Sequence, residues 1–140
     1  LDPFKARIVK EGSDITIVSY LKMVDDVMEA VPAIEKELGC SCEVIDLCSL
    51  NPVDYETLKN SIEKTSRFVM VEEDHKTGGY GAQIVSWAAE EVFYALDAPP
   101  LRLAGADTPV PYNRTLELAS IPTPQSIADD IIAWGRKNDV

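Results

Sequence analysis

Apolar runs rich in β-branched residues alternate with stretches of helical apolar spacing along this 140-residue chain. Strands that alternate with helices predict an α/β domain, in which helices cover both faces of a mainly parallel sheet. No linker, repeat or low-complexity stretch divides residues 1–140, so we expect one domain. The predicted strands span residues 6–10, 14–20, 42–47, 67–72 and 101–104. Helices are predicted over residues 21–38, 52–62, 84–92 and 124–134, with a short one around residue 116.

Several residues are typical of helix ends. Gly39 suits the C-terminal end of the first long helix, and Pro32 inside that helix is expected to kink it. Pro52 is predicted to be the first residue of the next helix. Thr123, which stands before Pro124, is predicted to cap the last helix. These residues set the expected boundaries of three helices.

The charge balance is strongly acidic, with 13 basic and 24 acidic residues and a formal net charge of -11. Such a surface repels phosphate groups, which argues against binding to nucleic acid or to an anionic membrane surface. On composition alone, acidic residues that only keep the domain soluble are the preferred interpretation, and a basic protein partner is the alternative. No apolar run is long enough to cross a bilayer, and the start of the chain lacks the pattern of a signal peptide. A chain that begins with Leu1 is expected to be part of a longer protein.

Three cysteines, Cys40, Cys42 and Cys48, lie close together in the sequence. Their odd number favours a reducing compartment over a disulfide framework. Because no His lies near them and their spacing matches no common zinc motif, no metal site is expected. Cys42 lies in an apolar run and is predicted to be buried.

Ligands of open α/β sheets bind beyond the carboxyl ends of the strands, where the segment of residues 71–82 has the richest set of functional groups. It contains the His of this chain, three consecutive acidic residues and a glycine cluster. Gly79 and Gly81 match the first two positions of a dinucleotide fingerprint, but Ile84 occupies the third. A tight turn with positive φ and close helix–strand contact is therefore the preferred interpretation. Anion or nucleotide binding at the helix start is the alternative.

Two residues at this edge of the predicted sheet have functional alternatives. His75 is expected to be hydrogen-bonded or exposed; it could instead line the mouth of a site shared with another subunit, or act as a catalyst. Asp107 is predicted to bond to the backbone two residues further on in a Pro-rich turn, or to pair with an Arg. The residues alone give no complete catalytic set, so they predict a flavodoxin-like domain and no reaction.

Short motifs in nearly every part of the chain match those of one known family. The matching segments are residues 5–7, 11–18, 42–47, 71–73, 78–84, 96–99, 105–107 and 111–112, with Arg102, Pro109 and Ile121-Pro122. Their order and spacing resemble β subunits of the thiamine-diphosphate-dependent, decarboxylating component of pyruvate and branched-chain 2-oxo acid dehydrogenases. The resemblance is to the C-terminal, transketolase-like domain of those subunits.

The resemblance implies a three-layer α/β/α fold with a mostly parallel five-stranded sheet whose first strand is antiparallel. It also implies that thiamine diphosphate and Mg²⁺ bind elsewhere in the full enzyme, between the α subunit and the N-terminal half of the β subunit. The Gly-Asp-Gly and Asn motif that holds them does not occur in this sequence, and neither does the segment with the cofactor-activating Glu. The chain alone is therefore expected to bind no cofactor and to catalyse no reaction.

The resemblance further implies a role in assembly and docking. The expected partners are the N-terminal half of the same subunit, the α subunit and second β subunit of an α2β2 enzyme, and the basic subunit-binding domain of the acyltransferase core. Asp97 and the carboxylate of Val140, if that is the native end, are candidates for the contact with the basic domain. His75, Gly78 and Gly79 are candidates for a loop near the mouth of the shared active site. The compartment would be the bacterial cytoplasm, which is favoured, or the mitochondrial matrix.

Two other functions are compatible with the same predicted fold. One is an independent flavodoxin-like module that binds a nucleotide or FMN at the loop of residues 78–81. The other is the C-terminal domain of a transketolase or a deoxyxylulose-phosphate synthase. The run from Asp107 to Tyr112 favours a dehydrogenase over these two enzymes. Pyruvate, a branched-chain 2-oxo acid and acetoin are alternative substrates of the full enzyme.

Overall fold

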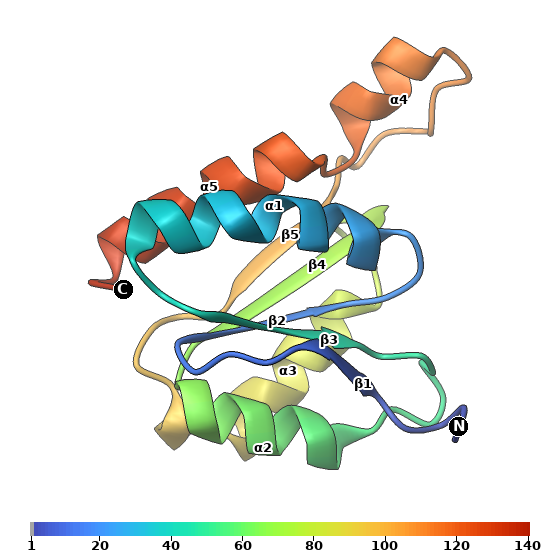
Figure 1. Cartoon of the computed structure of the whole chain (residues 1–140). Helices are drawn as coiled ribbons and strands as arrows, with labels where there is room; N and C mark the ends of the chain where they lie inside the picture. The colour runs from blue at the N-terminus through green and yellow to red at the C-terminus, as the bar shows by residue number, and fades with distance from the viewer. Residues whose placement is uncertain (1) are drawn as a thin grey trace.

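A five-stranded sheet with the strand order β1-β3-β2-β4-β5 lies between two layers of helices (Figure 1). β1 is antiparallel to β3, and the other neighbouring strands are parallel. The predicted fold class is therefore confirmed. The computed structural model describes residues 2–140. The strands are β1 Arg7–Lys10, β2 Ile15–Ser19, β3 Cys42–Asp46, β4 Phe68–His75 and β5 Leu101–Gly105. The helices are α1 Met23–Leu38, α2 Tyr55–Thr65, α3 Gly81–Glu91, α4 Arg114–Ser120 and α5 Pro124–Lys137, with a 3-10 turn η1 at Phe93–Ala95.

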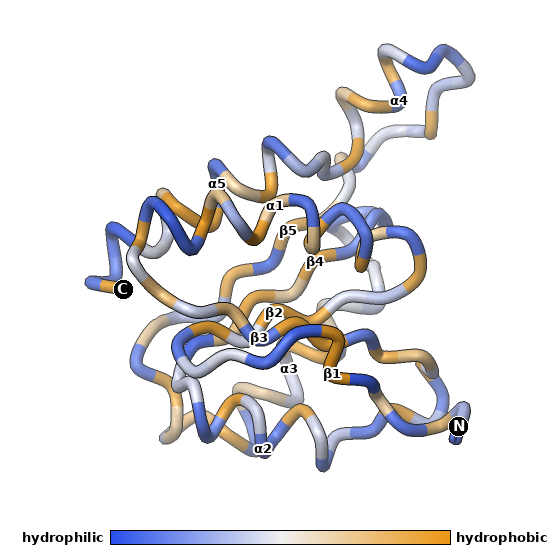
Figure 2. The backbone as a smooth tube through the Cα atoms, viewed as in Figure 1, coloured by the Kyte–Doolittle hydropathy of each residue, from blue (hydrophilic) through white to orange (hydrophobic). Residues whose placement is uncertain are grey.

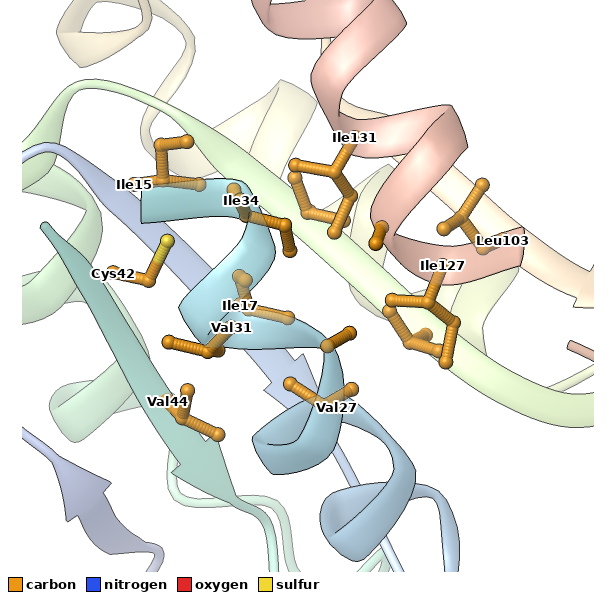
Figure 3. Close-up of a cluster of buried hydrophobic side chains, with 14 of the residues drawn as sticks. Ile15, Ile17, Val27, Val31, Ile34, Cys42, Val44, Leu103, Ile127 and Ile131 are labelled. Carbon is orange, nitrogen blue, oxygen red and sulfur yellow. The ribbon is translucent and has the colours of Figure 1, made fainter. Parts of the chain in front are cut away.

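Each face of the sheet has its own apolar core. α1 and α5 cover one face, and α2 and α3 cover the other (Figure 1). Figure 3 shows the first core, in which Ile34 of α1 and Ile131 of α5 point toward Ile17 of β2. On the other face, Phe68 of β4 packs with residues of α2 and α3 such as Leu58. The fully buried strands β2 and β3 explain why their sequences read as continuous apolar runs.

α1 and α5 approach closely at their C-terminal ends. A Cβ atom placed on Gly135 would lie 2.5 Å from Cδ1 of Leu38, so only glycine fits there without a shift. Gly39 ends α1 in the left-handed region, with φ 65°, and its N–H donates to the carbonyl of Glu35, as predicted. α1 continues past Pro32 to Leu38.

The prediction that Pro52 begins the second helix is wrong. α2 begins at Tyr55, and its cap is Asp54, whose carboxylate accepts hydrogen bonds from the Thr57 backbone N–H at 3.3 Å and the Thr57 hydroxyl at 2.7 Å. The same carboxylate accepts from the backbone N–H of Ala6 at 3.1 Å. The carboxylate of Asp54 accepts from a free backbone N–H at the start of the helix, and the Pro52 side chain has no acceptor that could do so. The helix therefore starts after Asp54.

β4 is longer than predicted and continues to His75 instead of ending at residue 72. Its last residues pair with β5, because His75 is the register partner of Gly105 and the backbone N–H of Lys76 donates to the Gly105 carbonyl at 2.8 Å. Glu73 and Asp74, expected in a loop, are therefore strand residues. Pairing to the adjacent strand outweighs the low strand propensity of consecutive acidic residues.

The segment of residues 106–121 projects from the rest of the domain and carries α4 (Figure 1). The helix predicted around residue 116 is confirmed, and Asn113 caps it by accepting from the backbone N–H groups of Thr115 and Leu116. No residue of α4 is buried. The chain then returns to the body, where Thr123 caps α5 and Pro124 is its first residue, as predicted.

Candidate functional site

The carboxyl edge of the sheet is organised around one buried carboxylate. Glu72, near the end of β4, has no exposed surface. It accepts hydrogen bonds from the backbone N–H of Gly81 at 2.7 Å, from the hydroxyl of Tyr20 at 3.0 Å and from Nε of Arg102 at 2.8 Å. A second nitrogen of Arg102 lies 2.6 Å from Glu72 Oε1. A buried ion pair persists only when such bonds satisfy both partners, and this one joins β2, β4, β5 and α3.

The remaining donors of Arg102 fix the backbone that follows β4. Its guanidinium donates to the carbonyls of Lys76 and His75, the latter at 3.1 Å. Lys76 in turn donates its ammonium to the carbonyl of Arg102. Burial and the nearby guanidinium lower the pKa of Lys76, while burial and the Glu72 carboxylate raise the pKa of Tyr20. The side chains of Arg102 and Lys76 are therefore engaged in contacts within the domain.

The glycine cluster allows this close packing. Gly78 has φ 82°, in the left-handed region that favours glycine. A Cβ atom on Gly79 would lie 2.4 Å from the carbonyl oxygen of His75. The preferred interpretation of a tight turn is therefore confirmed. Because the Glu72 carboxylate already accepts from the first N–H of α3, the position where a phosphate would bind at that helix is filled by a negative charge.

His75 and the next two residues hold the start of the projecting segment. Nε2 of His75 lies 2.8 Å from the carbonyl oxygen of Thr108, and its Nδ1 lies 3.7 Å from Asp74. The prediction that His75 is hydrogen-bonded is confirmed. Within residues 2–140 no hydroxyl or thiol bonds to its ring, so the arrangement contains no activated nucleophile.

Both interpretations of Asp107 are wrong. Its carboxylate accepts from the backbone N–H of Thr77 at 2.8 Å and from the Thr77 hydroxyl at 2.6 Å, and these bonds lower its pKa. Two residues beyond Asp107 the chain has Pro109, which carries no N–H to donate, and Arg102 is engaged by Glu72. Asp107 therefore anchors the projecting segment to the loop after β4.

The docking candidates lie at the opposite, amino edge of the sheet. Asp97 is exposed, and its backbone N–H donates to the Ser66 carbonyl at 2.8 Å. The indole of Trp134, in the last turns of α5, donates to the carbonyl of Pro99 at 3.0 Å. Val140 lies just beyond, with its N–H donating to Gly135, so the structure brings the loop of Asp97 and the end of the chain to one edge (Figure 1). His75, Gly78 and Gly79 belong to the other edge.

The pairing of Glu72 with Arg102 was missed by the sequence analysis. Glu72 directly follows the buried apolar part of β4, and Arg102 lies between apolar residues of β5; a charge in a buried strand requires a partner. Met70 is the register partner of Arg102, so Glu72 is its diagonal neighbour across the two strands. The register, which sequence does not give, was the information needed.

The cysteines of the chain are not part of the Glu72 cluster. Cys42 is fully buried, as predicted, and burial raises the pKa of its thiol; Cys48 is exposed. Among residues 2–140 no group of three His, Cys, Asp or Glu side chains is placed to hold a metal ion. No helix in the described part of the chain has the length and apolar character to span a membrane.

Comparisons with known proteins identify the family. The transketolase C-terminal domain family matches residues 4–127. The chain is 42% identical over 127 residues to pyruvate dehydrogenase E1 component subunit beta of Porphyra purpurea, covering 91% of this chain and 38% of that protein. It is 44% identical over 133 residues to the mitochondrial subunit beta-2 of Oryza sativa subsp. japonica, covering 95% and 34%. The chain thus spans little more than a third of these relatives.

A solved structure has the same architecture. A split-gene transketolase, described as an inactive β4 tetramer, superposes with a TM-score of 0.81 at 27% identity, covering 99% of this chain and 43% of that one. The fold, the match over residues 4–127 and the relatives agree. This chain belongs to the transketolase C-terminal domain family.

Proposed function

We propose that the chain is the assembly domain of the decarboxylating component of a pyruvate-type 2-oxo acid dehydrogenase and has no reaction of its own. The relatives named above are pyruvate dehydrogenase E1 β subunits, which supports the parent enzyme. Glu72 and Arg102 at the carboxyl edge are occupied by each other and by nearby backbone groups, which suits a structural role. The structural relative is described as inactive in its β4 form, which supports a domain that depends on other chains for activity.

The observation that carries the proposal is the projecting segment of residues 106–121. Val110 is 63% exposed and the side chain of Tyr112 is fully exposed, while Leu116 of α4 is 58% exposed. Figure 2 shows that the part of the chain around α4, which stands clear of the body, has hydrophobic positions interspersed with hydrophilic ones. A helix as short as α4 has little stability of its own in water, and exposed apolar residues gathered on one projection mark an interaction site. In the proposal this segment contacts the α subunit, the second β subunit or the N-terminal half of the same subunit.

The amino edge is proposed to dock the basic subunit-binding domain of the acyltransferase core. Asp97 follows the exposed aromatic pair Phe93 and Tyr94, whose ring centroids lie 5.4 Å apart. Aromatic anchors beside a carboxylate suit a cationic partner. Val140 lies at the same edge, and the net charge of -11 favours attraction of a basic domain.

Thiamine diphosphate and Mg²⁺ are proposed to bind in the full enzyme, outside this chain. His75, Gly78 and Gly79 are proposed to lie near the mouth of the active site that the subunits share. One relative is named as mitochondrial. We propose the bacterial cytoplasm or the mitochondrial matrix as the compartment.

Assembly of the full-length β subunit with its α subunit tests the proposal. We expect Tyr112→Ser to reduce the α2β2 fraction at least tenfold in size-exclusion chromatography, because it removes an anchor of roughly 2 kcal/mol or more. Tyr94→Ser is the matched control: it should leave α2β2 intact and weaken binding of the subunit-binding domain. Unchanged assembly and unchanged docking in the two variants would overturn the proposed roles.

A further inference from the structure

A groove of about 510 Å³ separates the projecting segment from the carboxyl edge of the sheet. Tyr20 and Tyr80 contribute aromatic rings to its wall, and Leu50, Val110 and Ile121 contribute aliphatic side chains. The hydroxyl of Tyr80 donates to the carbonyl of Leu50, so this wall is held in place by the domain itself. A volume in this range is typical of sites that take a small molecule or a few residues of a peptide.

The rim of the groove carries three carboxylates, from Glu73, Asp74 and Glu117. Within residues 2–140, Glu73 makes no ion pair and no side-chain hydrogen bond. Glu117 lies 3.4 Å from Arg114, but the Arg114 side chain is 73% exposed, and such surface pairs neutralise little. Asp74 accepts from the backbone N–H of His75 at 2.8 Å. The rim therefore has an excess of negative charge.

Apart from Arg114, which pairs with Glu117, the neighbouring basic side chains are engaged elsewhere. Arg102 binds Glu72, and the ammonium of Lys76 donates to the carbonyl of Arg102. The ring of His75 lines the groove but has one nitrogen bonded to the Thr108 carbonyl. The domain thus supplies apolar walls and three carboxylates, against which it sets only the exposed guanidinium of Arg114.

We infer that this groove receives a basic segment of another protein chain, with an apolar side chain on the wall and a Lys or Arg at the rim. The inference rests on the proposed function and names the chemistry of one partner. A second copy of this chain is disfavoured as the occupant, because each copy carries a net charge of -11. The groove lies at the opposite edge of the sheet from Asp97 and Val140, so it is a second interface.

A titration of the 140-residue chain with two short peptides, followed by amide chemical shifts, tests the inference. The probe is acetyl-Leu-Arg-Val-Lys-Leu-amide, and the control peptide replaces Arg and Lys by Glu. We expect shifts at Tyr20, Glu73, Tyr80 and Val110, with a dissociation constant below about 1 mM for the basic peptide only. The double variant Glu73→Gln with Glu117→Gln should bind roughly tenfold more weakly.

The matched control removes two carboxylates far from the groove, with Glu90→Gln and Glu91→Gln at the end of α3, and should change affinity less than about twofold. Equal binding of the acidic peptide, shifts centred on Asp97 and Val140, or equal affinity in both double variants would overturn the inference. If the basic peptide does not bind while the Tyr112 and Tyr94 variants behave as expected, the groove is not a docking site and the proposed function stands.

Discussion

Two buried glutamates lie near opposite edges of the sheet, on the face covered by α2 and α3, and they differ in how completely they are satisfied. Glu72, near the carboxyl end of β4, receives bonds from Tyr20, Gly81 and Arg102. The side chain of Arg102 is only 11% exposed. Each group in this cluster therefore depends on the others, and water cannot replace a missing partner.

Glu43, near the amino end of β3, is equally buried but less completely coordinated. Lys64 donates to its Oε2, and the backbone N–H of Gly12 lies 3.4 Å from the same oxygen. Its Oε1 has no hydrogen-bond partner among the described residues. Because the Lys64 side chain is 43% exposed, solvent reaches this pair and screens it. We therefore expect the exposure of the cation, more than the burial of the carboxylate, to decide how tightly each edge is held.

Removing the cation from each pair should have the largest effect on stability, and the effect should differ between the two edges. Arg102→Met leaves Glu72 buried without its charge partner and should lower the free energy of unfolding by about 3–5 kcal/mol. Lys64→Met, the matched change at the other edge, should cost only about 1 kcal/mol, because the half-exposed ammonium of Lys64 makes a solvent-screened interaction. Urea unfolding followed by circular dichroism measures both. Equal losses in the two variants would show that the exposure of the cation is not decisive.

Features that depend on neighbouring residues in the chain could be predicted from sequence. The apolar runs of β2 and β3 and the caps Gly39 and Thr123 follow from local chemistry, so the fold class, the end of α1 and the start of α5 were predicted correctly. The family resemblance supplied the antiparallel β1, which no local pattern in residues 6–10 indicates.

Contacts between strands and loops could not be predicted in this way. Glu72 meets Arg102 because of the β4–β5 register, and Asp107 meets Thr77 because the chain returns 30 residues later to the same edge. Such partners are set by the assembled sheet. For the same reason, the end of β4 was placed too early: its last residues are held by Gly105. Residues that bind across the sheet are thus the ones that sequence reasoning missed.

Lowering the pH should reduce the stability that the Glu43 pair contributes, with an effect of intermediate size. Burial opposes the charged form of Glu43, but bonds from Lys64, Ser61 and Gly12 hold its pKa below the ordinary value of 4.5. A depressed carboxyl pKa contributes stability that is present above the unfolded value and is lost as the pH falls through the folded one. Stability measured from pH 6 down to pH 3 should therefore fall less steeply in Glu43→Gln, by at most about one proton in slope. Identical slopes would contradict a charged Glu43 in the folded state.

The smallest effect is expected where an exposed carboxylate holds the base of the projecting segment. Bonds from Thr77 lower the pKa of Asp107, so this group is charged and accepts two hydrogen bonds at neutral pH. Asp107→Asn should leave the urea midpoint unchanged and speed hydrogen exchange at the Thr77 amide by roughly threefold to tenfold, since only a local opening becomes easier. Asp129→Asn, which changes an exposed carboxylate on α5, should leave that amide unaffected. If Thr77 is equally protected in both variants, the negative charge of Asp107 does not contribute to holding the base of the projecting segment, and the hydrogen bonds of the segment suffice without it.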